Sequence, residues 1–257
     1  MKYSLTLLIL VLFVLNLHSQ GQQDSLIRQE EQKVAEDPTQ FLTRLELFNE
    51  YQHFENGIDL NITTLRSVVK LGERFTSRID IPFVYNSKNT NDYKQFGLSD
   101  ISFRLLGYKI YQSRREALTL SIEVSLNTAQ SPLLGSGKNS VLLMGSYTRF
   151  LIPKRMLFAG TLQQANSFSG DAARNDLSFS KLQLVLLYFL SKKSWVVISP
   201  EYFMDYTKGQ QALNIESRLA YAPLPKFNVW AKAGAGLYGD FITRYQWTAE
   251  IGVRRFF

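Results

Sequence analysis

The sequence contains no cysteine and only two histidines among its 257 residues. The absence of cysteine excludes disulfide bridges, thiolate metal sites, a cysteine nucleophile and a lipid-modified N-terminal cysteine. His18 lies in the apolar N-terminal stretch, so catalysis that needs a histidine depends on His53 alone. The 29 basic residues outnumber the 22 acidic ones, but they are spread along the chain instead of clustering, which argues against nucleic-acid binding.

Long apolar runs are also scarce, and the one that stands out extends from Leu5 to Leu17, after Lys2 and before Ser19. A basic start, an apolar core and a small residue are typical of a secretory signal peptide. An uncleaved membrane anchor is the alternative, but the run is shorter than the roughly 20 residues of a spanning helix. We therefore predict a signal peptide over residues 1–19, cleaved near Ser19, and export into a bacterial envelope.

Residues 20–40 are polar and carry no alternating pattern. One interpretation is a flexible periplasmic lead-in, with a short helix over 25–36 as a variant. The other interpretation is a plug that enters a barrel from below. The sequence leaves both open.

From residue 41 to the end, apolar and polar residues alternate over many short stretches, as in strands whose successive side chains leave opposite faces. In the stretch 117–128, for example, Ile122 and Val124 share one face, and Ser121 and Glu123 share the other. The pattern predicts twelve strands, approximately at 41–54, 60–72, 75–87, 97–112, 117–128, 140–151, 155–166, 177–190, 195–206, 211–222, 227–238 and 243–257. Two of them, 97–112 and 177–190, lose the alternation midway, which predicts a β-bulge in each.

The connections between these strands are alternately short and long. Tight turns such as Pro153-Lys154 and Lys192-Lys193 would lie at one end, and longer loops such as 129–139 and 167–176 at the other. Bacterial outer-membrane barrels have short periplasmic turns, longer extracellular loops and an even number of strands, with both termini on the periplasmic side.

Alternation alone does not tell which face is wet, because a soluble barrel would bury its apolar face inside. Three features favour a membrane barrel: strands of spanning length, charges of both signs at mid-strand on one face only, and a last strand ending in an aromatic residue. Aromatic residues near strand ends are placed for interfacial girdles: Phe41, Phe75, Tyr85, Tyr188, Tyr206, Tyr221, Phe227, Tyr245 and Phe257. We predict an all-β fold, a closed antiparallel up-and-down transmembrane β-barrel of about 12 strands over residues 41–257.

Two stretches carry a resemblance to known proteins. The alternating last strand that ends in Phe257 resembles the closing signal that outer-membrane barrels present to the barrel-insertion machinery. The stretch 96–104, FGLSDISFR, resembles a motif of predicted outer-membrane transporters associated with phenol meta-pathway degradation. That family continues into a Pro-Thr-Gly-like corner, where this chain has Asn127-Thr128-Ala129. The resemblance implies the cell outer membrane as location, with outer-membrane lipid, lipopolysaccharide and the insertion machinery as partners, and it implies little about the solute.

The predicted inward face carries basic and acidic residues in near balance. A selective pore would be lined mainly by one sign, whereas a balanced set favours salt bridges between strands that stiffen the interior. Twelve strands further predict a narrow, partly obstructed channel, and inward-facing Gly234 and Gly236 allow either a close approach by a loop or a strand bend. The candidate lumen-lining residues are Arg66, Lys70, Arg78, Asp80, Arg104, Glu123, Lys181, Glu201, Glu216, Arg218, Lys232, Glu250 and Arg254.

Evidence for an enzyme is weak. His53 has Ser125, Ser140 and Ser146 as candidate nucleophiles, but no sequence spacing links them to it. Scattered carboxylates, among them Asp171 and Asp176, suggest no metal site, and nothing in the sequence implies a cofactor. The sequence favours a channel or transporter for an unknown small solute over a structural or complex-forming barrel without transport activity, and over an outer-membrane lipid hydrolase.

Overall fold

The structure is a computed structural model that describes residues 36–88, 93–113, 115–240 and 243–257. The predicted signal peptide and residues 20–35 lie outside the described residues. The strands are β1 (Arg44–His53), β2 (Ile58–Lys70), β3 (Phe75–Lys88), β4 (Tyr93–Leu98), β5 (Ile101–Gln112), β6 (Glu116–Leu126), β7 (Lys138–Ile152), β8 (Met156–Gly170), β9 (Ser178–Phe189), β10 (Ser194–Asp205), β11 (Gln211–Leu224), β12 (Phe227–Gly239) and β13 (Trp247–Phe256). No helix in these ranges is long and apolar enough to cross a membrane.

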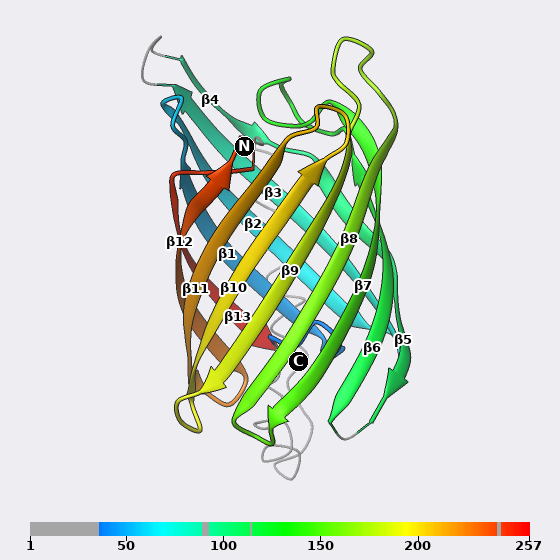
Figure 1. Cartoon of the computed structure of the whole chain (residues 1–257), viewed down its shortest axis with the longest axis vertical. Coiled ribbons are helices and arrows are strands. Elements are labelled where there is room, and N and C mark those ends of the chain that lie inside the picture. The colour runs from blue at the N-terminus through cyan, green and yellow to red at the C-terminus, as the bar shows by residue number, and fades with distance from the viewer. Residues whose placement is uncertain (1–35, 89–92, 114, 241–242) are drawn as a thin grey trace, which may run out of the picture.

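The strands form one closed antiparallel barrel, as predicted (Figure 1). Apart from β4 and β5, which both pair with β3, consecutive strands pair with each other, and β1 pairs with β13 along its whole length, which closes the sheet. β4 and β5 together make one wall position, because β3 pairs with β4 through Phe83–Lys88 and with β5 through Phe75–Asp80. The barrel therefore has twelve wall positions, and the thirteenth strand arises from a break at Ser99 and Asp100.

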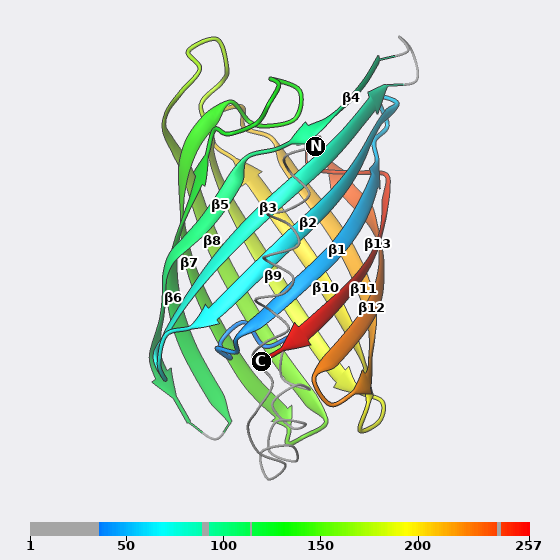
Figure 2. The same ribbon diagram turned by 180° about the vertical axis from the view of Figure 1, so that it is seen from behind.

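The connections confirm the predicted asymmetry. At one end, short turns join the strands, and the barrel both begins with β1 and finishes with β13 there (Figure 2). At the other end lie longer connections, including 127–137, 171–177 and 240–246. These are the periplasmic and extracellular ends of an outer-membrane barrel.

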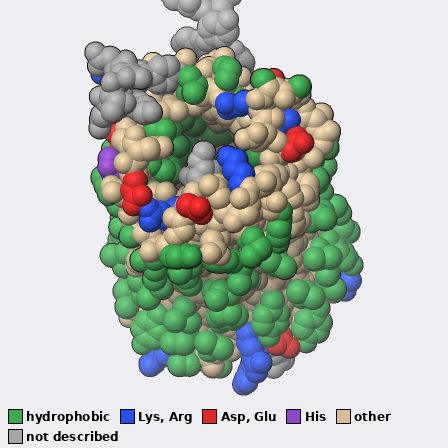
Figure 3. Space-filling view, turned by 45° about the horizontal axis from the view of Figure 1, so that its top comes forward, with side chains coloured by type: hydrophobic (Ala, Val, Ile, Leu, Met, Phe, Trp, Pro, Cys, Tyr) green, Lys and Arg blue, Asp and Glu red, His purple; other side chains and the backbone are tan. Residues whose placement is uncertain are grey.

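The apolar faces of the strands point outward. On β6, Ile122 is 40% exposed, whereas Glu123 is 6% exposed and faces the interior. β13 repeats the pattern, with Ile251 exposed and Glu250 buried. Apolar side chains cover the outer wall in Figure 3, and charged ones gather at the open extracellular mouth. Because the outward faces are apolar, the barrel presents hydrocarbon to lipid, and charged side chains such as Glu123 and Glu250 line its lumen.

Of the two predicted bulges, one is present. β5 shifts register against β6 between Arg104 and Leu106 and again between Lys109 and Tyr111. The bulge predicted for 177–190 is wrong, since β9 keeps a constant register with both β8 and β10. Alternation fails there for a different reason: Leu187 faces inward and is completely buried in an apolar cluster inside the barrel, so both faces of β9 are apolar.

That apolar cluster fills one side of the lumen near the periplasmic end. Its buried members come from five neighbouring strands: Leu157, Leu187, Trp195, Val197, Ala220 and Trp230. The alternation in the sequence predicts a mainly polar inward face and does not predict this cluster. The cluster narrows the water-filled part of the barrel to the remaining side.

Two of the nine aromatic residues predicted for the girdles lie inside the barrel instead. Phe41 and Tyr245 are almost fully buried, because neither belongs to a strand: Phe41 precedes β1 and Tyr245 precedes β13, and both segments fold into the lumen. Exposed aromatics on the outer surface, consistent with girdles, are Phe75, Tyr85, Tyr188, Tyr206, Tyr221 and Phe257.

Candidate functional site: the charged lumen

The lumen contains a cavity of about 430 Å³ that brings most of the candidate residues together. Asp80 is buried next to this cavity and accepts a hydrogen bond from Arg66, although it does not line the cavity itself. Lys70 does not join them; it is exposed at the periplasmic end of β2. The candidates that line the cavity are Arg66, Arg78, Arg104, Glu123, Lys181, Glu201, Glu216, Arg218, Lys232, Glu250 and Arg254.

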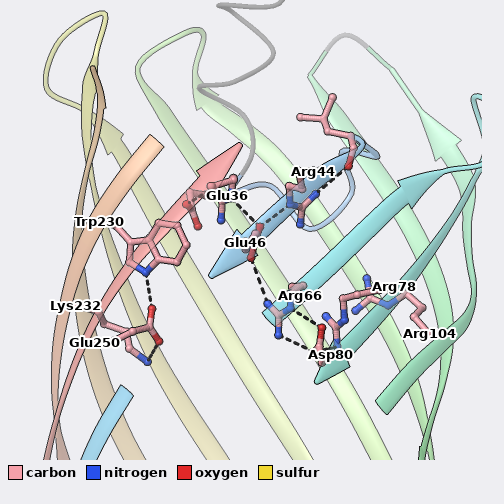
Figure 4. A network of polar contacts seen from close by, with 12 residues as sticks. Glu36, Arg44, Glu46, Arg66, Arg78, Asp80, Arg104, Trp230, Lys232 and Glu250 are labelled. Carbon is pink, nitrogen blue, oxygen red and sulfur yellow. Dashed lines mark hydrogen bonds and ion pairs between the residues drawn. The ribbon is translucent and has the colours of Figure 1, made fainter. Parts of the chain in front are cut away.

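On the β2–β6 wall, three arginines share the carboxylates of Asp80 and Glu123, and Figure 4 shows the arginines together with Asp80. Arg66 donates two N–H groups to Asp80, each at 2.8 Å. Arg78 reaches Glu123 at 2.5 Å, and Arg104 lies 3.7 Å from the same carboxylate. Arg78 and Arg104 stand directly opposite each other on β3 and β5. Three arginines against two carboxylates give this part of the wall an excess of positive charge. Because like charges directly opposite each other repel, Arg78 and Arg104 need the carboxylate of Glu123 nearby.

On the facing wall, Lys232 is the centre of an ion-pair network. Its ammonium group lies 3.0 Å from Glu50 and from Glu216 and 3.1 Å from Glu250. The Tyr245 hydroxyl donates to Glu216 at 2.9 Å. Since these residues come from β1, β11, β12 and β13, the network ties together the strands on both sides of the barrel closure.

The carboxylate of Glu46 on β1 forms ion pairs with three arginines. Arg44 Nε and Arg254 Nε lie 2.6 Å and 2.7 Å from Glu46 Oε1, and Arg66 Nη1 lies 3.7 Å from Oε2. The Glu46 side chain is only 3% exposed. A buried carboxylate among three guanidinium groups neutralises charges that would otherwise repel one another.

Trp230 on β12 supports two of the arginines. The guanidinium carbons of Arg218 and Arg254 lie 5.4 Å and 5.1 Å from the indole ring, within the range of cation–π contacts. The indole N–H donates to Glu250 at 2.5 Å. Gly252 is opposite Trp230 on β13, and a Cβ there would collide with the indole ring. Neither residue is among the candidates predicted from the sequence, although a glycine opposite a tryptophan on paired strands indicates close packing once the register is known.

Residues 36–43, called here the strap, cross the lumen at its periplasmic end. Glu36 lies 2.9 Å from Arg218 and 2.9 Å from Arg254. Thr39 hydrogen-bonds to Thr148 on β7 at 3.0 Å. Because β7 and β13 are on opposite sides of the barrel, the strap bridges the lumen from wall to wall.

Burial affects the two acids of the strap differently. It raises the pKa of Asp37, because the hydrogen bonds from Thr39, Thr148 and Gln40 do not fully offset the loss of hydration. Burial would also raise the pKa of Glu36, but Arg254 and Arg218 outweigh it and hold that pKa below its ordinary value. Glu36 is therefore ionised at neutral pH and serves as the anionic anchor of the strap.

Toward the extracellular end, a second cavity of about 390 Å³ continues the first. Both are lined by Lys181, Glu201 and Lys232. Both alternatives considered for Gly234 and Gly236 have support: a Cβ on Gly236 would collide with the backbone of Tyr245 in the 240–246 loop, and β12 shifts register against β11 between Gly236 and Tyr238. The lumen thus contains connected cavities with charged residues in their walls, between the strap and the mouth.

The FGLSDISFR stretch anchors an extracellular loop. Asp100 accepts hydrogen bonds from the backbone and hydroxyl of Ser136, each at 2.7 Å, and from Ala129 N at 3.2 Å. Gly135 packs against Asp100 where a Cβ would not fit. The break between β4 and β5 therefore places Asp100 to hold the 127–137 loop beside the mouth, while Arg104 of the same stretch enters the lumen.

His53 lies at the extracellular end of β1, and its Nδ1 is 2.6 Å from Asp59 on β2. Ser125 and Ser140 pair with each other on β6 and β7, and Ser146 bonds to Thr161. These strands are separated from β1 by β2, β3 and β5, so the structure does not bring His53 to any of the three serines.

The two loop carboxylates considered for a metal also have separate partners. Asp176 pairs with Lys138 at 2.9 Å, which lowers the pKa of its carboxyl, and Asp171 accepts from Ala173 N at 2.9 Å. Within the described ranges, no three His, Asp or Glu side chains are grouped as ligands for a metal ion.

No protein-family model and none of the curated proteins matches the chain. Solved structures do resemble it. An outer-membrane channel from Pseudomonas putida F1 has a TM-score of 0.73 and 13% identity, covering 86% of this chain and 99% of that one. The NanC porin has a TM-score of 0.61, 10% identity and coverage of 83% and 99%. The KdgM porin in complex with disordered oligogalacturonate has a TM-score of 0.58, 10% identity and the same coverage. At these identities the likeness shows a shared fold, that of an outer-membrane β-barrel.

Proposed function

We propose that this protein is an outer-membrane channel for small polar solutes, with a narrow lumen that the strap restricts from the periplasmic side. The observation that carries the proposal is a pair of cavities inside a closed, lipid-compatible barrel, both lined by the charged residues Lys181, Glu201 and Lys232. A barrel that served only as a wall could fill its interior with apolar side chains, as the cluster around Trp195 does on one side. The charged side keeps space for water and solute.

Structural likeness supports the same function. The three similar structures are an outer-membrane channel and two porins, and one of them contains an oligogalacturonate. Residues 1–19 supply the cleaved export signal in this proposal, and the last strand ending in Phe257 is the part that the insertion machinery recognises. Lipid and lipopolysaccharide then surround the apolar outer wall.

The direct test is ion conduction by the purified protein in planar lipid bilayers. Brief, small conductance steps are expected for the unmodified chain, because the strap narrows the lumen. Glu36→Gln removes the anion that anchors the strap to Arg218 and Arg254, so longer open times or larger steps, by about twofold or more, are expected. Persistent silence of both proteins over a range of voltages and salts would contradict the channel function.

The apolar cluster and the strap also favour a second candidate, a structural or complex-forming barrel that transports nothing. Both features obstruct the lumen, and together with the ion pairs they stiffen it. This candidate predicts silence in the bilayer experiment and no gain of current with Glu36→Gln.

A further inference from the structure

Arg218 and Arg254 point their guanidinium groups at one carboxylate. Arg218 Nη1 donates to Oε2 of Glu36 and Arg254 Nη1 donates to Oε1, both at 2.9 Å. Two cationic donors, one for each carboxylate oxygen, are an arrangement that recognises a carboxylate strongly and with defined orientation. The Glu36 side chain is 8% exposed, so the contact is largely shielded from water.

Arg218 and Arg254, called here the clamp, belong to the barrel wall, and contacts other than Glu36 hold them in position. Trp230 lies beneath both guanidinium groups, and each arginine keeps another acidic partner: Arg254 Nε is 2.7 Å from Glu46, and Arg218 Nη2 is 3.2 Å from Glu250. Glu36, by contrast, belongs to the strap, which contributes no strand to the barrel. The donors therefore stay in place when the strap moves away.

The wall around the clamp favours an anion. The cavity of about 430 Å³ is lined by eight basic and eight acidic residues, and two of the acidic ones, Glu36 and Asp37, belong to the strap. Among the described residues, the Nε atoms of Arg78, Arg104 and Arg218 are buried without a hydrogen-bond partner, and all three side chains line this cavity. Without the strap, the wall is basic and has unused N–H donors.

A solute in the lumen would have access to the clamp. Glu36 and Arg218 line both the large cavity and a smaller one of about 130 Å³ beside the strap. We propose that Arg218, Arg254 and Trp230 form a carboxylate-binding site that the strap's Glu36 occupies in the closed channel and that the carboxylate of a small organic solute takes when the strap withdraws. This inference rests on the proposed channel function and adds the class of solute.

The first test compares gluconate with sorbitol, a neutral molecule of similar size, as blockers of potassium chloride current in planar bilayers. In Glu36→Gln the clamp is vacated, so gluconate is expected to halve the current at a concentration at least tenfold lower than in the unmodified protein. Adding Arg218→Gln to Glu36→Gln should raise that concentration again by about tenfold. Sorbitol should have little effect on any of them. Equal block by gluconate and sorbitol, or no change on adding Arg218→Gln, would overturn the site.

The second test reads binding without conduction. The chain has three tryptophans, so Trp195→Phe with Trp247→Phe leaves Trp230 as the reporter. Glu36→Gln is then added to this double tryptophan variant, and the folded protein in detergent should show a saturable change of Trp230 fluorescence with gluconate and no change with sorbitol. Adding Arg218→Gln should abolish the change with gluconate. Silence in bilayers together with this change would reject the channel and retain the site. Conduction without the change, and without selective block by gluconate, would reject the site and retain the channel.

Discussion

Glu46→Ala is expected to lower the free energy of unfolding by about 3–5 kcal/mol, the range for removing one partner of a buried ion pair. The carboxylate lies among Arg44, Arg66 and Arg254, and nothing else described in the structure could replace it between all three. Arg66 keeps Asp80 and Arg254 keeps Glu36, so the loss comes from Arg44, whose acidic partner is removed, and from the repulsion among the three guanidinium groups. Equilibrium unfolding in denaturant with lipid vesicles, followed by tryptophan fluorescence, measures it.

Glu73→Ala is the matched control. Glu73 is an exposed carboxylate in the turn between β2 and β3, so its removal should change stability by less than about 0.5 kcal/mol. If the two substitutions had equal effects, Glu46 would not stabilise the interior in the way described.

Ile122→Arg should cost about 2–4 kcal/mol of stability in lipid, because it would place a charge on the outer wall in the middle of β6. The side chain of Ile122 has no polar group beside it on that face: its neighbours across the strand pairs are Leu106 and Leu143. Val124→Arg should behave similarly. The same unfolding experiment in vesicles gives the difference from the unmodified protein.

Ser121→Arg tests the neighbouring position on the opposite face. Ser121 lines the large lumen cavity, where an added guanidinium group remains hydrated and near Glu123, so a smaller loss is expected. A larger loss for Ser121→Arg than for Ile122→Arg would mean that the two faces of β6 are reversed.

Much of the fold could be predicted because every strand that crosses the membrane needs apolar side chains at its lipid-facing positions. Leu120, Ile122 and Val124 on β6 and Ile251 and Val253 on β13 had to be apolar at every second position, and the sequence shows this directly. The lengths of the loops can also be read from the residues between neighbouring strands. These signals identify twelve wall positions, and they require no knowledge of which strands are neighbours across the lumen.

The interior was predicted less completely because its contacts join distant parts of the chain. Glu36 meets Arg218 and Arg254, which are 182 and 218 residues away, and no pattern near residue 36 indicates that pairing. The lumen also tolerates apolar side chains where they pack together. On β9, Leu187 and Val185 belong to such an apolar cluster, and they remove the alternation of apolar and polar residues along this strand.

The most direct test of the whole account is cysteine labelling on β6, which is clean because the natural chain has no cysteine. Ser121→Cys and Ile122→Cys would each be folded into lipid vesicles and treated with a small, charged, membrane-impermeant thiosulfonate. Position 121 is expected to react through the water-filled lumen, whereas position 122 is expected to be protected by lipid and to react only after denaturation. Rapid labelling at 122 together with protection at 121 would contradict it.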